Sequence, residues 1–415
     1  MKRSLIALAT GSFALGFSEF VMMGILPIAA VGLGVSVPDA GSFISSYALG
    51  VCAGTLFLVF GRRVPPKRLL LLFVALMVVG NAAAAAAPSA EALTAARFVS
   101  GLPHGAFFGT ATIAAKKLAD PGREGQAVSI MVLGQTMANM LGVPGGTLLA
   151  GMLSWRAAFL FVAVWAVGSL LLVLRFVPRM DPIPDAGLAG QFRFLKKPGP
   201  WLVIGAVLLG NTGVFCWWSY VSPWLTDVGG FPAFQVPALL VLAGLGMVIG
   251  SLAGGRVSDR TTPGKTSAIG QTVGCATLAL IFLFSGTQPS SAALMFACAF
   301  GMFFVSSPQQ LLMVNVGRGG GEMIGSACVP VAYNLGTAVG AMIGQAVLNA
   351  GAGYAWPSLA GVPFSLMAAG LLVAFFLRFE KSYRVAPERA ACAFPVQYEH
   401  APQTTGYAAP SKGTS

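Results

Sequence analysis

The sequence predicts an all-α membrane protein: twelve transmembrane helices in two six-helix halves, with both termini in the cytoplasm. Three observations lead to this fold class. Apolar residues make up 56% of the 415 residues and charged residues only 9%, whereas soluble proteins hold about 45–50% and about 25%. The apolar residues form continuous runs of about 20 residues, the length that a helix needs to cross a bilayer. The basic residues gather in every second connection between these runs.

The composition also excludes several classes of protein. The chain has too few charged residues to cover a soluble enzyme or a nucleic-acid-binding domain of this size, and it is too apolar for a disordered scaffold. A β-barrel is excluded because its strands alternate between apolar and polar residues. Five of the six cysteines lie within apolar runs and none has the spacing of metal ligands, so we expect free thiols, no metal site and no cofactor.

Twelve runs are long enough to span the membrane. The first could be mistaken for a signal peptide because Lys2 and Arg3 precede it, but its apolar part is too long and eleven similar runs follow. Glycine and proline occur inside many runs, which membrane helices tolerate. The expected spans of the first half are 5–27, 43–61, 69–87, 92–115, 127–151 and 157–176. Those of the second half are 201–226, 236–255, 267–286, 292–314, 324–350 and 357–377.

The basic residues predict the orientation of these spans. All but two of the 25 Lys and Arg residues fall at the termini or in even-numbered connections. The exceptions are Arg156, in the fifth connection, and Arg97, inside the fourth span. Because positive residues mark the cytoplasmic side of a membrane protein, both termini are expected in the cytoplasm.

The longest internal polar connection divides the chain into two comparable parts. We expect a six-helix half over 1–176, a central cytoplasmic loop over 177–200, a second half over 201–378 and a disordered cytoplasmic tail over 379–415. Gly50 and Gly54, before one basic cluster, are echoed by Gly246, Gly250 and Gly254 before another. Two six-span repeats around a site at the midplane are a common plan of transporters.

Motifs in the connections and the fourth span point to a known family. After the eighth span, Gly255, Asp259 and Arg260 fit the pattern G-x-x-x-D-R. The equivalent connection after the second span keeps positive charge with Arg63 and Lys67 but has no aspartate. The fourth span reads R-x-x-x-G-x-x-x-G and continues as H-G-A-F-F-G.

The fifth span adds a further motif. It contains Gly142, Pro144, Gly145 and Gly146 within five residues, and W-R-x-x-F follows at the next turn. In order and spacing these motifs resemble the major facilitator superfamily over about residues 5–378, and within it the twelve-span drug:proton antiporters. The combination with the fourth-span motif and Asn139 is most similar to the AraJ-type transporters of arabinose polymers. The resemblance implies a bacterial cytoplasmic-membrane transporter that acts as a monomer on protons and a small molecule.

The resemblance also implies which residues line the substrate cavity. Spans one, four, seven and ten surround the cavity in this family, which favours Asn211, Gln309 and Gln310 as substrate contacts, with Gln135 and Asn139 of span five. About half of these amides are expected to hold helices together instead. The glycine-rich stretch of span five is associated with antiport in the family, although close helix packing explains small residues equally well.

Two charges inside the membrane require a reason, because a buried charge costs at least ~2.5 kcal/mol in a bilayer. Glu19 lies ~21 Å above the cytoplasmic edge and Arg97 ~9 Å below the outer edge, which is the same level in a slab of ~30 Å. The functional interpretation is a proton or substrate switch, in which desolvation favours the neutral form of Glu19 and the approach of Arg97 favours its charged form. The alternatives are a static ion pair, or an Arg97 that reaches outward to the interface.

His104 and the aromatic residues of span seven also have two interpretations. His104 lies two turns deeper than Arg97 and could relay protons, or it could be a neutral residue bonded to a neighbouring helix. Trp217 and Tyr220 are three residues apart and share a helix face, which favours contact with a sugar ring or a flat drug. The alternative is an aromatic belt at the membrane surface.

Together these observations predict a secondary transporter rather than an enzyme. The sequence holds no G-x-S-x-G, H-E-x-x-H or P-loop pattern, so energy must come from an ion or substrate gradient. We expect proton-coupled export of a sugar or arabinose-type solute, or of a small amphiphilic drug. A proton-coupled importer, and a membrane receptor or scaffold without transport, remain as alternatives.

Overall fold

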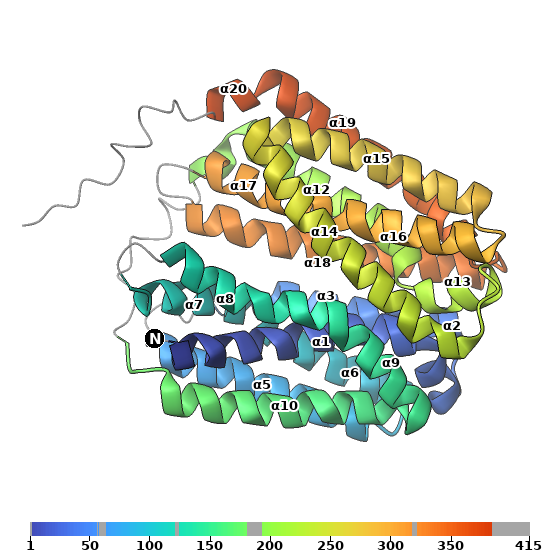
Figure 1. Ribbon diagram of the computed structural model, residues 1–415, viewed down its shortest axis with the longest axis horizontal. Helices are drawn as coiled ribbons and strands as arrows, with labels where there is room; N and C mark the ends of the chain where they lie inside the picture. Colours follow the sequence, from blue (N-terminus) through green and yellow to red (C-terminus); the bar gives the residue numbers. More distant parts are fainter. Residues whose placement is uncertain are drawn as a thin grey trace, which may run out of the picture.

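The computed structural model describes residues 2–55, 57, 64–120, 124–180, 193–317 and 322–383, which fold into helices joined by short connections (Figure 1). The first bundle contains α1 (Lys2–Leu33), α2 (Val37–Ala40), α3 (Ser42–Gly54), α5 (Pro66–Ala86), α6 (Ala90–Gly101), α7 (Pro103–Lys117), α8 (Glu124–Met137), the π-helical turn η2 (Ala138–Gly142), α9 (Val143–Met152) and α10 (Trp155–Phe176). The second contains η3 (Arg193–Lys196), α12 (Pro198–Trp218), α13 (Val221–Asp227), η4 (Ala233–Gln235), α14 (Val236–Arg260), α15 (Pro263–Phe284), α16 (Gln288–Phe304), α17 (Ser306–Val316), α18 (Glu322–Asn349), α19 (Trp356–Arg378) and α20 (Glu380–Tyr383).

Prolines explain where several expected spans are interrupted. Proline lacks the N–H that bonds to the carbonyl four residues earlier, so a helix breaks or widens just before it. Pro103 begins α7 after the break that ends α6, and Pro144 follows the π-helical turn η2. Pro223 and Pro308 lie just after the breaks between α12 and α13 and between α16 and α17. The apolar runs in the sequence predict each of these pairs as one continuous span, so that prediction is wrong at these breaks.

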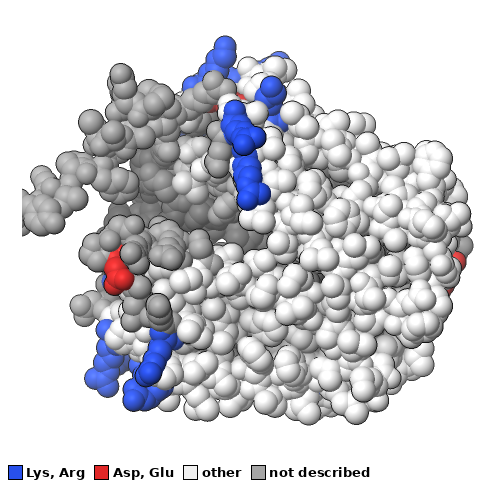
Figure 2. Space-filling model, viewed as in Figure 1, with Lys and Arg blue, Asp and Glu red and all other residues white. Residues whose placement is uncertain are grey.

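The helices are long and apolar enough to lie in a membrane. Nine segments within the described residues meet the length and hydropathy of a membrane-crossing helix. The other three expected spans, 43–61, 92–115 and 127–151, contain helices that are shorter or interrupted. Leu160, Val164 and Leu171 on α10 are each more than half exposed. On the face drawn in Figure 2, Lys and Arg gather toward the end where α1 starts, and the broad described surface beyond them is uncharged except for a few acidic atoms at the far right edge.

The two bundles lie side by side, and both ends of the described chain lie at the same end of the molecule (Figure 1). We call this the terminal end and the opposite one the distal end. A single buried apolar cluster runs through the first bundle, from Leu5 to Ile25, and continues into the distal part of the second bundle at residues such as Trp224 and Leu240. A second cluster around Phe194 and Phe375 belongs to the second bundle alone. The halves are therefore packed together most extensively toward the distal end.

Glycines give the two bundles matching internal contacts. A Cβ added at Gly50 or Gly54 of α3 would collide with the backbone carbonyl of Phe98 or Leu102. In the second bundle, a Cβ at Gly250 or Gly254 of α14 would collide in the same way with carbonyls of α16. Small residues at spacings of four allow such close helix contacts in membranes. The glycine echo seen in the sequence is thus a repeated helix–helix contact.

This contact predicts opposite outcomes for two neighbouring glycines. Gly254→Ala should lower the melting temperature in detergent, because its Cβ would meet the carbonyl of Phe304 and overpacking costs about 1–3 kcal/mol. Gly255→Ala is the matched control, since nothing lies within 4 Å of its added Cβ. Equal melting temperatures for the two variants would show that the α14–α16 contact does not limit stability.

The start of the expected disordered tail differs from the prediction. Residues Glu380–Tyr383 form α20, and the ring of Tyr383 stacks on Phe375 with centroids 6.0 Å apart. The buried Glu380 accepts a hydrogen bond at 2.8 Å from the N–H of Gly264, at the start of α15. A carboxylate is favourable there because the first N–H groups of a helix lack partners within it. Residues 384–415 of the expected tail lie outside the described part.

Candidate functional site

Glu19 and Arg97 lie at the same level inside the first bundle, as their depths predict. Both are buried, with exposed fractions of 6% and 0%. The guanidinium reaches the backbone carbonyl of Glu19 at 3.5 Å rather than its carboxylate. The two residues therefore meet, but through the main chain of α1.

Arg97 is occupied by backbone and aromatic partners. Its Nη1 donates to the carbonyl of Ser18 at 2.6 Å, and its Nε donates to the carbonyl of Phe43 at 3.3 Å. Its Cζ lies 4.3 Å from the centre of the Tyr47 ring and 5.6 Å from that of Phe159. These contacts fix the guanidinium among α1, α3 and α10. An outward-reaching arginine, one of the alternatives, does not fit this geometry.

The carboxylate of Glu19 faces His104 and Gln135 instead. His104 Nε2 lies 3.7 Å from Glu19 Oε2, and Gln135 Nε2 donates to the same oxygen at 3.3 Å. The other ring nitrogen of His104, Nδ1, is 2.8 Å from the hydroxyl of Tyr47. The site therefore places the carboxylate of Glu19, the imidazole of His104 and the phenol of Tyr47 in a row. The sequence did not indicate Tyr47 as a member of this site.

The antiporter-type motif lies where α1 packs against the fifth span. Gly142 ends the π-helical turn, and Pro144 stands in the first turn of α9. A Cβ at Gly142 or Gly146 would meet Phe17 or Val21 of α1, whereas nothing lies within 4 Å of one at Gly145. π-turns inside helices occur frequently at functional sites. The side chain of Asn139, in the same turn, lies outside the described residues.

The amides expected from the second half lie in two places. Asn211 donates to the carbonyl of Val207 at 2.7 Å and lines a small cavity with the buried Gln271. This cavity lies among α12, α15 and α16, within the second bundle. Gln309 is buried in α17 and Gln310 is partly exposed. At least Asn211 therefore bonds within its own helix in this conformation.

The aromatic residues of the seventh span belong to the distal packing. Trp217 is fully buried and packs edge-on against Trp224, with ring centroids 4.8 Å apart. The hydroxyl of Tyr220 lies 3.2 Å from the carbonyl of Pro38 and 3.1 Å from that of Ala341. Because Pro38 belongs to the first bundle, Tyr220 bridges the two halves.

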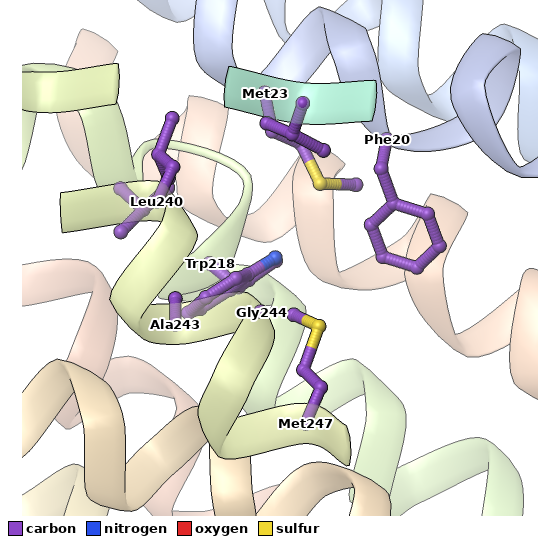
Figure 3. A pocket seen from close by; sticks show the side chains of 9 residues that line it. Phe20, Met23, Trp218, Leu240, Ala243, Gly244 and Met247 are labelled. Atoms are coloured by element: carbon purple, nitrogen blue, oxygen red, sulfur yellow. The ribbon is translucent and has the colours of Figure 1, made fainter. Parts of the chain in front are cut away.

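A small apolar pocket lies between the halves, and Phe20, the residue after Glu19 in α1, lines it (Figure 3). Phe20 and Met23 of α1 face Trp218, Met247 and their neighbours on α12 and α14. The cavity measures about 10 Å³, which is room for roughly one water molecule. A solute could enter only after the halves move apart.

A second contact between the halves lies at the distal end and was not foreseen. Asp39 of α2 accepts hydrogen bonds from Asn349 Nδ2 at 2.9 Å and from Gln345 Nε2 at 3.2 Å, both on α18. Ser36 Oγ donates to the other carboxylate oxygen at 2.6 Å. These bonds, that of Ser36 above all, hold the pKa of Asp39 below its ordinary value. Asp39 is exposed in a polar connection, so no sequence pattern marked it.

The cytoplasmic loop motif is described only in part. Lys67 donates to the carbonyl of Leu174 at 2.9 Å and so ties the start of α5 to the end of α10. Gly255 and Arg260 lie in the last turns of α14, and the Arg260 side chain is exposed. Arg63 and the side chain of Asp259 lie outside the described residues. Lys67 and Arg260 both lie at the terminal end.

Comparisons with known proteins agree with this architecture. The sequence profile of the family described as Major Facilitator Superfamily matches residues 8–327. The "Putative transporter AraJ" of Escherichia coli (strain K12) is 39% identical over 90% of this chain and 95% of its own length. The inner membrane transport protein YdhP of the same strain is 32% identical over 94% and 98%. The chloramphenicol resistance protein of Streptomyces lividans is 30% identical over 95% and 99%.

A solved structure shares the fold. The crystal structure of a bacterial homologue of the human lysosomal transporter Spinster, in an inward-facing and unoccupied conformation, superposes with a TM-score of 0.71. It covers 92% of this chain and 98% of its own at 18% identity. The fold, the apolar helices and the family match together show that this chain belongs to the Major Facilitator Superfamily and is a multi-pass membrane transporter, not an enzyme.

Proposed function

We propose that the protein is a proton-coupled exporter of the bacterial inner membrane. The observation that carries this proposal is the buried carboxylate of Glu19, which lies 3.7 Å from His104 Nε2 and accepts a hydrogen bond from Gln135. A carboxyl group in such a place changes its proton affinity when water or a partner approaches or leaves. Alternating access of the two halves supplies that change.

We also propose the topology that this function requires. The helices account for twelve crossings when α6 with α7, α8 with α9, α12 with α13, and α16 with α17 are each counted as one and the four-residue α2 and α20 are left out. The halves are 1–176 and 201–378, joined by the loop 177–200, and the terminal end with its basic residues is cytoplasmic. The distal end is then periplasmic, and its Asp39 and Tyr220 contacts close the outward path in this conformation.

The substrate is a small neutral or weakly charged molecule, in our proposal a sugar or arabinose-type solute or an amphiphilic drug. The apolar pocket beside Phe20 and Trp218 favours a molecule with an apolar face. Gln135, whose Oε1 is buried without a hydrogen-bond partner among the described residues, favours one that also donates hydrogen bonds. The proposed carrier works as a monomer.

Flux in proteoliposomes with an imposed pH gradient tests this function. The probes are L-arabinose, an arabinose oligomer, chloramphenicol and tetraphenylphosphonium. We expect one probe to move against its own gradient in exchange for protons, and a proton ionophore to abolish the movement. Movement in the same direction as the protons would identify an importer, and no proton-driven flux of any of these probes would contradict the proposal.

A further inference from the structure

Tyr47 connects the two parts of the candidate site. It is 2% exposed on α3. Its hydroxyl lies 2.8 Å from His104 Nδ1 and 3.3 Å from the carbonyl of Leu15, and its ring lies under the guanidinium of Arg97. We propose that Tyr47 is a positioning residue: its hydroxyl determines which ring nitrogen of His104 carries the hydrogen, and hence whether His104 donates to or accepts from Glu19. This inference deepens the proposed proton coupling and rests on it.

The argument follows from counting hydrogens. The hydroxyl has one hydrogen and two possible acceptors, His104 Nδ1 and the carbonyl of Leu15. When it donates to Nδ1, that nitrogen is bare and the neutral ring carries its hydrogen on Nε2. Nε2–H then points to the ionised carboxylate of Glu19. The shorter of the two distances favours this arrangement in the present conformation.

Adding one proton reverses the pattern. Nε2 gives its hydrogen to Glu19 Oε2, and the incoming proton, which comes from water, ends on Nδ1. Nδ1–H then donates to the oxygen of Tyr47, whose own hydrogen turns to the carbonyl of Leu15. The ring stays neutral, the acid becomes neutral, and the site holds one proton more than before. Tyr47 and His104 Nδ1 are hydrogen-bonded in both patterns, with donor and acceptor exchanged.

The position of Tyr47 links this exchange to the movement of the halves. Ser45 Oγ, on the same helix, donates to the carbonyl of Ala338 of α18 at 3.1 Å. Tyr47 moves with α3, so any shift of α3 against α7 when α3 and α18 separate changes the distance between the Tyr47 hydroxyl and His104. The other ionisable groups that face the site are Arg97, whose guanidinium lies over the Tyr47 ring, and Tyr333 of α18, which lies within electrostatic range of Glu19.

Nitrogen NMR of histidine tests the inference without any substrate. The chain has two histidines, His104 and His400, so His400→Gln leaves only the ring of interest. With ¹⁵N-labelled histidine in nanodiscs at mildly alkaline pH, we expect one tautomer, with hydrogen on Nε2 and a bare, hydrogen-bonded Nδ1. In Tyr47→Phe, which keeps the ring under Arg97, we expect the loss of this preference and a mixture of both tautomers.

A second buried tyrosine provides the control. Tyr220→Phe removes a hydroxyl that also lies near two carbonyls, and it should leave the His104 signals unchanged. A wild-type ring with hydrogen on Nδ1 overturns the inference even if Tyr47→Phe does not fold. Unchanged nitrogen shifts in a folded Tyr47→Phe overturn it too. Neither NMR result depends on transport. If the NMR excludes the role of Tyr47 but a Glu19 variant still loses proton-driven flux, the proposed function stands and only this inference fails.

Discussion

Glu19→Gln is expected to abolish proton-driven transport while exchange of substrate across the membrane continues. Glutamine keeps the size of the side chain and its hydrogen bonding to Gln135, but it cannot take up or release a proton. Accumulation driven by a pH gradient should fall at least tenfold, to the level of empty liposomes. Equilibrium exchange of labelled for unlabelled substrate, which needs no net proton movement, should stay within about threefold of wild type.

The control is the other buried carboxylate on the described helices. Glu380 is 4% exposed and caps α15 through the N–H of Gly264, far along the chain from the site. Glu380→Gln is expected to lower the melting temperature by a few degrees and to keep pH-driven accumulation. Full accumulation by Glu19→Gln would remove this residue from the coupling mechanism.

Arg97→Met should eliminate both modes of transport. Methionine fills similar space without charge or donors, so the carbonyls of Ser18 and Phe43 would lose their hydrogen bonds from Arg97. A hydrogen bond to a charged group contributes about 1.5–3 kcal/mol. We expect gradient-driven flux and exchange to fall at least tenfold together, with a lower melting temperature, because α1 and α3 lose the group that holds them in register.

Arg156→Met makes the same substitution at an arginine with a smaller role. Its Nη2 donates to the carbonyl of Ala87 at 2.8 Å, and its side chain is only partly buried. This variant should transport at close to the wild-type rate. Arg97→Met with wild-type exchange would show that the arginine does not organise the site. Arg97→Lys keeps the charge but lacks the planar guanidinium with its several N–H donors. Compared with Arg97→Met, it should restore the melting temperature more than the rate of transport.

The fold was predictable because its signals are collective. Runs of apolar residues predict the spans, and the bias of Lys and Arg toward the cytoplasmic side predicts their orientation. Where the structure describes a whole helix, most of its ends lie within a few residues of the predicted run. The breaks in the helices at Leu102, Ser219 and Val305 could not be predicted from the nearby prolines, because a proline in a membrane helix sometimes leaves the helix continuous. Pro27, Pro330 and Pro363 lie inside unbroken helices here. Packing against neighbours decides between the two outcomes.

The site was predictable only as far as depth could be estimated. A rise of ~1.5 Å per residue brings Glu19 and Arg97 to one level, but the rotation of each helix decides which atoms meet. That rotation directs Arg97 to the main chain and Tyr47, and leaves the carboxylate to His104 and Gln135. Tyr47 and Asp39 carried no signal, since a single tyrosine in a span and an aspartate in a connection are ordinary there.

The central claim is that protonation of Glu19 governs the alternation of the two halves. It is tested most directly by measuring the distance between spin labels at Val31→Cys and Phe234→Cys, two highly exposed positions in different bundles, in a background without native cysteines. Asp39 of the distal contact does not itself respond between pH of about 5 and about 9, because its lowered pKa keeps it ionised until the pH falls well below that range.

We predict a distance distribution that shifts with pH over this range in the wild-type background and does not change with pH in Glu19→Gln. A pH-dependent shift of the same size in both proteins, or no shift in either, would contradict the account.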